Sequence, residues 1–85
     1  MYLHLGKGTL IPKKSVIGIF DLDITSQSHL TRKYLHMAER GGEVVNAAED
    51  IPKSFVVCDE KGRKTVILSQ MATATLLKRS ENDVL

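Results

Sequence analysis

Two short runs of apolar and β-branched residues, 54–58 (SFVVC) and 65–68 (TVIL), constrain the fold more than any other part of the sequence. The charged segment 59–64 (DEKGRK) between them contains one glycine, so the pattern predicts a β-hairpin. Successive side chains of a strand point to opposite faces, and here both faces carry apolar residues. We therefore expect this hairpin to be buried on both faces, at the centre of the sheet, with the other elements covering it.

The first twelve residues predict a second hairpin. Residues 2–5 and 9–11 are short apolar runs, and the segment between them has two glycines that permit the positive φ of a tight turn. Pro12 follows the second run and should end the ladder of hydrogen bonds, because proline has no N–H to donate.

Two further strands are expected after this hairpin. Residues 16–20 (VIGIF) form a nearly continuous apolar run that should pair near the central hairpin, and Gly18 indicates a bulge or a close backbone approach. Residues 43–47 (EVVNA) predict a short strand at the edge of the sheet.

Two helices complete the prediction. The first begins at a cap on Thr25 or Ser26 and ends at Arg40, where two glycines supply a left-handed stop. Its apolar residues follow the i, i+4, i+7, i+8 spacing of a face that packs on the sheet. That predicted buried stripe consists of Leu30, Tyr34, Met37 and Ala38. The second helix covers residues 72–79, and residues 80–85 should form a frayed tail.

Together these elements predict one α+β domain over residues 1–85, with a small antiparallel-rich sheet of about six short strands, one long helix and a short C-terminal helix. A chain of 85 residues, 42% hydrophobic, holds one core. A ligand cleft of about 300–1,000 Å³ would consume much of that core, so size favours a binding or assembly role over catalysis. The single cysteine, Cys58, fits a buried position in a reducing, cytoplasmic protein. No apolar run approaches the roughly 20 residues of a membrane span.

One string resembles a catalytic motif. Residues 19–25 (IFDLDIT) are similar to the first motif of haloacid-dehalogenase-type phosphatases, in which Asp21 would attack phosphorus and Asp23 would transfer protons. That family needs a doubly wound parallel sheet and further lysine and carboxylate groups, which a chain this short cannot supply. Three histidines are too few and too scattered to predict a metal site: His4, His29 and His36. We expect no enzyme activity and no cofactor.

The lysines and arginines are grouped, although the formal net charge is only +2. DNA backbone binding requires little more than cations brought onto one surface, so these groups are candidates for phosphate contacts. The candidates are Lys53, Lys13, Lys14, Arg32, Lys33 and Arg40. His36 shares the helix face, and the central hairpin adds Lys61, Arg63 and Lys64. The alternative is an ordinary solvated surface balanced by neighbouring acids.

Five short segments, in the same order, resemble the extracellular matrix regulatory protein family, specifically its RemB branch. They are residues 1–6 (MYLHLG), 17–21 (IGIFD), 52–57 (PKSFVV), 68–69 (LS) and 75–79 (TLLKR). The resemblance covers nearly the whole chain. It implies a small bacterial cytoplasmic protein that takes part in the control of biofilm-matrix gene expression.

The resemblance also implies a mode of action. The related RemA branch binds DNA as a ring-like oligomer, through two arginines just before the strand that is predicted here at residues 54–58. In this sequence Ile51 and Pro52 stand at or near those positions, and Lys53 is the nearby cation. We expect a homo-oligomer that contacts double-stranded DNA first through Lys53, Lys13 and Lys14. The alternative is a self-assembling protein-interaction module that binds no nucleic acid and has an unidentified protein partner.

Overall fold

The computed structural model describes residues 2–22 and 29–81. Its elements are β1 (Tyr2–Gly6), β2 (Thr9–Pro12), the 3₁₀ turn η1 (Lys13–Ser15), β3 (Val16–Asp21), α2 (His29–Arg40), β4 (Val44–Asn46), β5 (Ser54–Glu60), β6 (Arg63–Ser69) and α3 (Thr73–Glu81). The α+β class is confirmed, but the six strands form two sheets, β1-β2 and β3-β5-β6-β4, instead of one. All pairings are antiparallel except that of β4 with β6. The expected contrast of a long and a short helix is not confirmed, since α2 has 12 described residues and α3 has 9.

The central hairpin is confirmed, with longer strands than the sequence suggested. The expected six-residue loop is wrong, because Asp59 pairs with Lys64 and Glu60 pairs with Arg63 across the two strands. Opposite charges on facing positions favour this extension of the ladder. The turn has two residues, Lys61 and Gly62, at φ values of 55° and 82°. Positive φ at both positions matches the twist of a two-residue hairpin turn.

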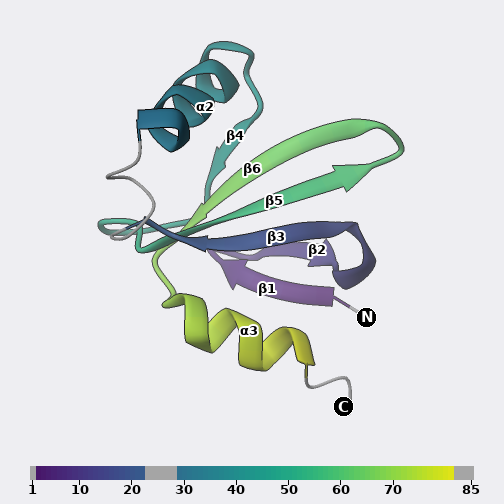
Figure 1. Ribbon diagram of the computed structural model, residues 1–85. Coiled ribbons are helices and arrows are strands. Elements are labelled where there is room, and N and C mark those ends of the chain that lie inside the picture. Colours follow the sequence, from purple (N-terminus) through teal and green to yellow (C-terminus); the bar gives the residue numbers. More distant parts are fainter. Residues whose placement is uncertain (1, 23–28, 82–85) are drawn as a thin grey trace.

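The chain forms three layers with the four-stranded sheet in the middle. Figure 1 shows α2 on one face of this sheet, and β1, β2 and α3 on the other. Every residue of β5 from Ser54 to Cys58 is buried. The core on the α3 side is formed by Leu3, Leu5, Ala47, Val56, Cys58, Ile67 and Leu76, and the core on the α2 side by Ala38, Phe55, Val57 and Val66. The two-faced hairpin is therefore covered on both faces, as its sequence predicts.

The orientation of α2 differs from the predicted one. Ala38 is buried, but Leu30, Tyr34 and Met37 are 74%, 42% and 62% exposed, so the prediction that they are buried is wrong. The helix turns Leu35 and Ala38 to the sheet instead. At the end of α2, the Glu43 amide donates to the Ala38 carbonyl at 2.9 Å, and the Glu43 carbonyl accepts from the Val66 amide at 2.8 Å, which ties this end of the helix to β6.

The end of the central hairpin ties the layers together through two buried serines. Ser54 pairs with Ser69 across the strands, and both are 0% exposed. The Ser54 hydroxyl donates to the carbonyl of Met71 at 2.8 Å. The Ser69 hydroxyl donates to the carbonyl of Leu5 at 2.8 Å and accepts from the Met71 amide at 3.1 Å. One serine pair thus joins β1 and the approach to α3 to the central sheet.

The predicted irregularity in β3 is a bulge. The register shifts between Val16 and Gly18, which leaves Ile17 without a partner on β5. Phe20 stacks on Phe55 of the neighbouring strand, with ring centroids 5.0 Å apart and an interplanar angle of 21°. A Cβ atom at Gly18 would lie 2.7 Å from the Phe20 ring, so the missing side chain makes room for this ring.

The structure describes some of the predicted helix ends and not others. Gly42 has φ 72°, which confirms the left-handed stop after α2. The last helix continues to Glu81, two residues beyond its predicted end. The predicted caps Thr25 and Ser26, and residues 82–85 of the predicted tail, lie outside the described residues.

The serine pair generates a stability prediction. Ser69→Ala should lower the free energy of unfolding by about 1–3 kcal/mol, because it leaves the buried Leu5 carbonyl and Met71 amide without their partner. Urea unfolding measures this as a lower midpoint at unchanged slope. The control is Ser80→Ala, whose hydroxyl donates to the Leu77 carbonyl at 2.8 Å on the exposed side of α3. That change should cost no more than about 0.5 kcal/mol, and equal losses for both variants would contradict the prediction.

The single thiol generates a second prediction. Burial raises the pKa of the Cys58 thiol above its ordinary value, a hydrogen bond with Ser15 lowers it in part, and the negative charge of Glu60 raises it. The thiolate is the reactive form, so folding disfavours it. Cys58 should react with a disulfide reagent at pH 8 much more slowly in the native protein than in urea, as followed by absorbance. Equal rates would show that the thiol is accessible in the folded chain.

Candidate nucleic-acid interface

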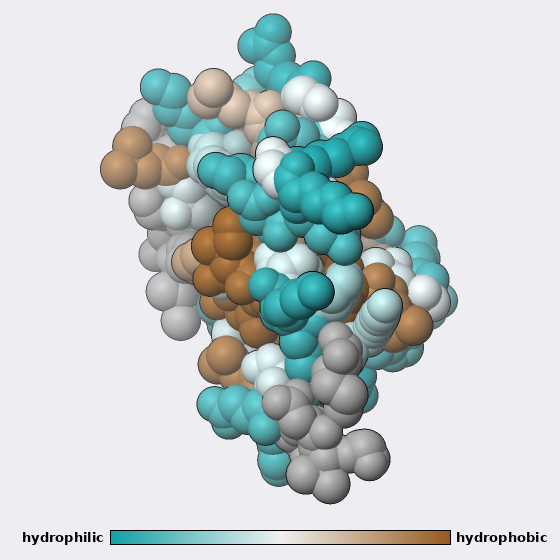
Figure 2. Space-filling model, turned by 90° about the vertical axis from the view of Figure 1, so that its right-hand side faces the viewer, coloured by the Kyte–Doolittle hydropathy of each residue, from teal (hydrophilic) through white to brown (hydrophobic). Residues whose placement is uncertain are grey.

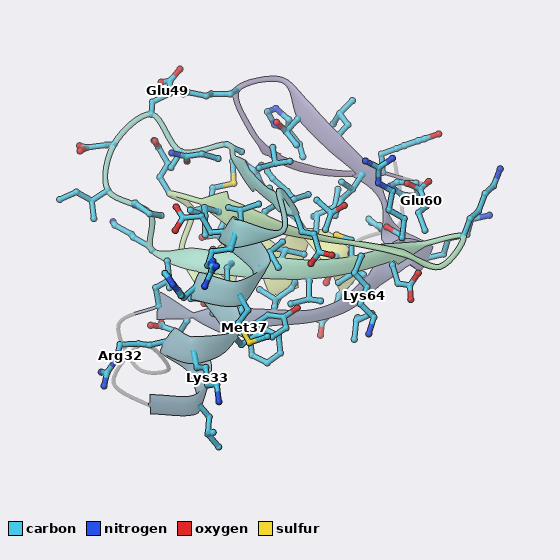
Figure 3. All side chains as sticks on the ribbon, turned by 90° about the horizontal axis from the view of Figure 1, so that it is seen from above. Arg32, Lys33, Met37, Glu49, Glu60 and Lys64 are labelled. Atoms are coloured by element: carbon cyan, nitrogen blue, oxygen red, sulfur yellow. The ribbon has the colours of Figure 1, made fainter. Side chains whose placement is uncertain are left out.

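The outer face of α2 carries several basic side chains. Arg32, Lys33, His36 and Arg40 are all exposed, and their spacing places them on the side of the helix opposite the buried Ala38. Figure 3 shows Arg32 and Lys33 extending from the first turns of α2 away from the sheet. The predicted cationic helix face is therefore present as one continuous exposed ridge, which we call the α2 ridge.

The helix α2 carries a net positive charge. Between His29 and Arg40, three cations stand against one acid, Glu39, which gives a formal charge of +2. The whole chain has the same formal charge of +2, so the cations and acids outside α2 cancel. The field of a small protein follows such local excess more than its total charge.

Lys53 lies beside the same end of the molecule. A hollow of about 360 Å³ is lined by Leu22, Arg32, Leu35, His36, Glu39, Val44, Pro52 and Leu68. Lys53 follows Pro52 directly and is exposed. Two hydrogen bonds hold the main chain of Lys53. Its amide donates to the Ser69 carbonyl at 2.8 Å, and its carbonyl accepts from the Leu22 amide at 2.9 Å. Pro52, the residue before Lys53, thus shares this hollow with Arg32.

Lys13 and Lys14 lie elsewhere. They belong to η1, which precedes β3 and contacts β5. Val16, just after η1, pairs with Cys58, whereas Asp21 at the other end of β3 pairs with Ser54, next to Lys53. Four residues of strand separate these two positions, about 13 Å along the sheet. The structure therefore does not bring Lys13 and Lys14 together with Lys53.

The cations of the central hairpin are balanced locally. Lys64 faces Asp59 and Arg63 faces Glu60 across the strands, and Lys61 stands in the turn. Figure 1 shows this hairpin projecting beyond the neighbouring strands. Exposed pairs of opposite charge leave little net attraction for an anion. This group is better described as a solvated tip than as part of a phosphate-binding surface.

The described residues offer no metal-binding constellation. Among residues 2–22 and 29–81, no cluster of three or more His, Cys, Asp or Glu side chains could hold a metal ion. Asp21 ends an edge strand of a mostly antiparallel sheet, unlike the doubly wound parallel sheet of the phosphatase family, and Asp23 lies outside the described residues. In the same part of the chain, no helix is both long and apolar enough to cross a membrane.

The sequence interpretation missed an apolar surface next to the α2 ridge. It consists of exposed side chains on α2 and on β3: Leu30, Tyr34, Met37, Ile17 and Phe20. A signal for it was present, because the apolar residues of α2 include Leu35 as well as the predicted stripe. Together they span more of the helix circumference than one contact with a sheet can cover.

Comparisons with known proteins agree on one family. Residues 2–79 match the RemA-like family model, described as Extracellular matrix regulatory protein A-like. Extracellular matrix regulatory protein B of Bacillus subtilis (strain 168) is 28% identical over 81 residues, which cover 95% of this chain and 91% of that protein. The resemblance found in the sequence is confirmed. Because the family model spans nearly all of the chain, this protein belongs to the RemA-like family of extracellular matrix regulatory proteins.

Proposed function

We propose that this chain is a non-enzymatic, cytoplasmic regulator of biofilm-matrix gene expression that binds double-stranded DNA as a homo-oligomer. Membership of the RemA-like family supports the regulatory role. The observation that carries the DNA-binding part is the α2 ridge, whose three exposed cations give α2 a formal charge of +2 despite Glu39. Lys53 is exposed and follows Pro52, which lines the same hollow as Arg32, so we assign it to the same basic surface.

The dimensions of the α2 ridge suit a phosphate backbone. Arg32 and Arg40 are eight residues apart, which corresponds to about 12 Å along a helix. DNA carries a phosphate roughly every 3.4 Å of axis on each strand, so the ridge spans a few phosphates. Such contacts position a protein on the duplex without reading base sequence. We therefore expect the α2 ridge to contribute affinity for DNA but little preference for base sequence.

Self-association would supply the remaining affinity. A single ridge with Lys53 offers few phosphate contacts, and each is weak and sensitive to salt. An oligomer repeats the surface, and tethered weak contacts combine into avidity. Lys13 and Lys14, on a different part of the chain, form a second candidate group that an assembled particle could present to the same duplex.

A second candidate function is a self-assembling protein-interaction module that binds no nucleic acid. The exposed apolar surface on α2 and β3 favours it, since contiguous apolar patches on small proteins mark interaction sites. Both candidate functions include self-assembly of the chain. They differ in whether the α2 ridge binds DNA. A direct DNA titration separates them.

The DNA-binding proposal predicts a salt-dependent interaction. The anisotropy of a labelled AT-rich duplex should rise on titration, and log affinity should fall with log salt by about 0.9 for each phosphate neutralised. Lys33→Glu/Arg40→Glu should lower the affinity at least tenfold and reduce the salt slope by roughly two contacts. Lys53→Glu should also weaken binding, and Lys13→Glu/Lys14→Glu should weaken it less than the α2 variant.

The matched control is Lys78→Glu. Lys78 is exposed on α3, on the opposite face of the sheet, and the substitution makes the same charge change per residue. Its salt slope should equal that of the unaltered protein. Equal losses for Lys78→Glu and for the α2 variant would show a general charge effect and contradict the assigned surface. No binding at low salt would favour the interaction module.

A further inference from the structure

The hollow at the flank of the α2 ridge, which we call the ridge hollow, has an apolar floor. Four of its lining side chains are partly buried and pack against the α2-side core: Leu22, Leu35, Val44 and Leu68. Pro52 completes the apolar lining. The volume, about 360 Å³, lies in the range of small-molecule sites, about 300–1,000 Å³. An apolar group that enters the ridge hollow would therefore extend the core of the protein.

One wall of the ridge hollow carries charge. Arg32, His36 and Glu39 line it from α2 at the spacing i, i+4, i+7, so they stand along one face of the helix. Arg32 and His36 are about one turn apart, whereas Glu39 lies about 10 Å from Arg32 along the helix. Figure 3 shows Arg32 extending from the first turns of α2. The Arg32 end of the hollow is therefore suited to an anion, and the Glu39 end is not.

The backbone around the ridge hollow is held in place without a ligand. The Leu22 amide donates to the Lys53 carbonyl at 2.9 Å, next to Pro52. Val44 and Leu68 belong to β4 and β6, which pair within the central sheet. A site whose walls are already ordered does not lose affinity to the ordering of loops.

The other hollow on the α2 side has a different chemistry. It lies between α2 and β3, and its lining includes Phe20, Leu30 and Tyr34 but, among the described residues, no charged side chain. Figure 2 shows apolar surface gathered at the height of the sheet, next to charged side chains. Apolar surface alone does not specify a ligand. The ridge hollow does, because it places a guanidinium beside an apolar floor.

We infer that the ridge hollow binds a free amphiphilic carboxylate, of the class of the medium-chain fatty acids. The carboxylate lies on Arg32, and the tail lies over Leu35, Val44 and Leu68. Arg32 already has an interaction within the chain, and its planar fork of five N–H donors can hold a carboxylate as well. His36 adds a ring N–H one turn further along α2. The tail leaves water for the apolar floor, and this burial supplies affinity.

Binding of such a ligand would regulate the α2 ridge. Arg32 belongs to the ridge, so a carboxylate on Arg32 occupies a cation that the proposed function assigns to DNA. The negative head group also lowers the positive potential beside the remaining cations. The ligand therefore competes with DNA. This regulatory step rests on the proposed function, whereas the binding site does not.

The test uses hexanoate, octanoate and decanoate, each titrated below its micelle concentration into isotopically labelled protein and followed by amide chemical shifts. Each added CH₂ group should tighten binding roughly fourfold until the hollow is filled. The amides of Leu35, Val44 and Leu68 should shift, and those of β1 and β2 should not. Decylammonium, with the opposite head charge, should bind at least tenfold more weakly than decanoate. No decanoate binding, or equal affinity for decylammonium, would overturn the inference.

Two variants of the charged wall should act in opposite directions. Arg32→Gln should weaken decanoate binding about tenfold or more, because a charged hydrogen-bond partner is lost. Glu39→Gln should strengthen it about two- to fivefold, since a like charge leaves the wall, and a gain cannot come from unfolding. The matched control is Arg79→Gln, the same exchange at an exposed position on α3, which should bind like the unaltered protein. Equal losses for Arg32→Gln and Arg79→Gln, or a loss for Glu39→Gln, would contradict the site.

DNA binding is measured separately on the same protein, by the anisotropy of the labelled duplex with and without decanoate. Decanoate should release the duplex, and acetate, which has the head group without the tail, should not. If decanoate binds as described and the protein binds no duplex, the ligand site stands and the DNA-binding proposal fails. If the duplex binds and decanoate does not, the ligand site fails and DNA binding stands. If both bind without competition, the regulatory step is wrong.

Discussion

The β5–β6 hairpin has apolar side chains on both of its faces, β3 and β4 pair with its edges, and the remaining described elements cover its faces. Val56, Cys58 and Ile67 require β1, β2 and α3 on one side. Phe55 and Val66 require α2 on the other. A hairpin with apolar side chains on both faces is not stable in water by itself. A layer that covers one face still leaves the apolar side chains of the other face exposed to water. The three-layer arrangement is the smallest solution for a chain of this length.

Local patterns predicted the elements well, because strand alternation and glycine punctuation are properties of short segments. The two hairpins, the bulge near Gly18 and the stop at Gly42 were all predicted from neighbouring residues. The rotation of α2 was not, since its apolar residues permit more than one buried face. In the structure Leu35 and Ala38 face the sheet, and the helix end is tied to β6 by the hydrogen bond from Val66 to the Glu43 carbonyl. The spacing of apolar residues within the helix does not show which of its faces is buried.

In the candidate interface, too, features of short segments were predictable from the sequence and long-range features were not. Residue types identified the basic positions, and the exposure of Arg32, Lys33 and Arg40 agrees with a solvent-facing helix. Their separation from Lys13 and Lys14 follows from the register of β3 on β5, which is a long-range property. The family is confirmed by its model, whereas the six basic candidates differ in whether the fold groups them. Pro52, next to Lys53, shares a hollow with Arg32, whereas η1 lies at the other end of β3.

The hydrogen bond between Ser69 and Leu5 joins residues 64 positions apart, and this affects the order in which the chain can fold. During synthesis, β1 and β2 leave the ribosome first, but an isolated two-stranded hairpin is marginally stable at best. The segment that β1 covers is not complete until β6 has emerged. The N-terminal hairpin therefore spends most of translation without its docking site. Contacts of such long sequence separation close late, so the last layer to form is the one that was made first.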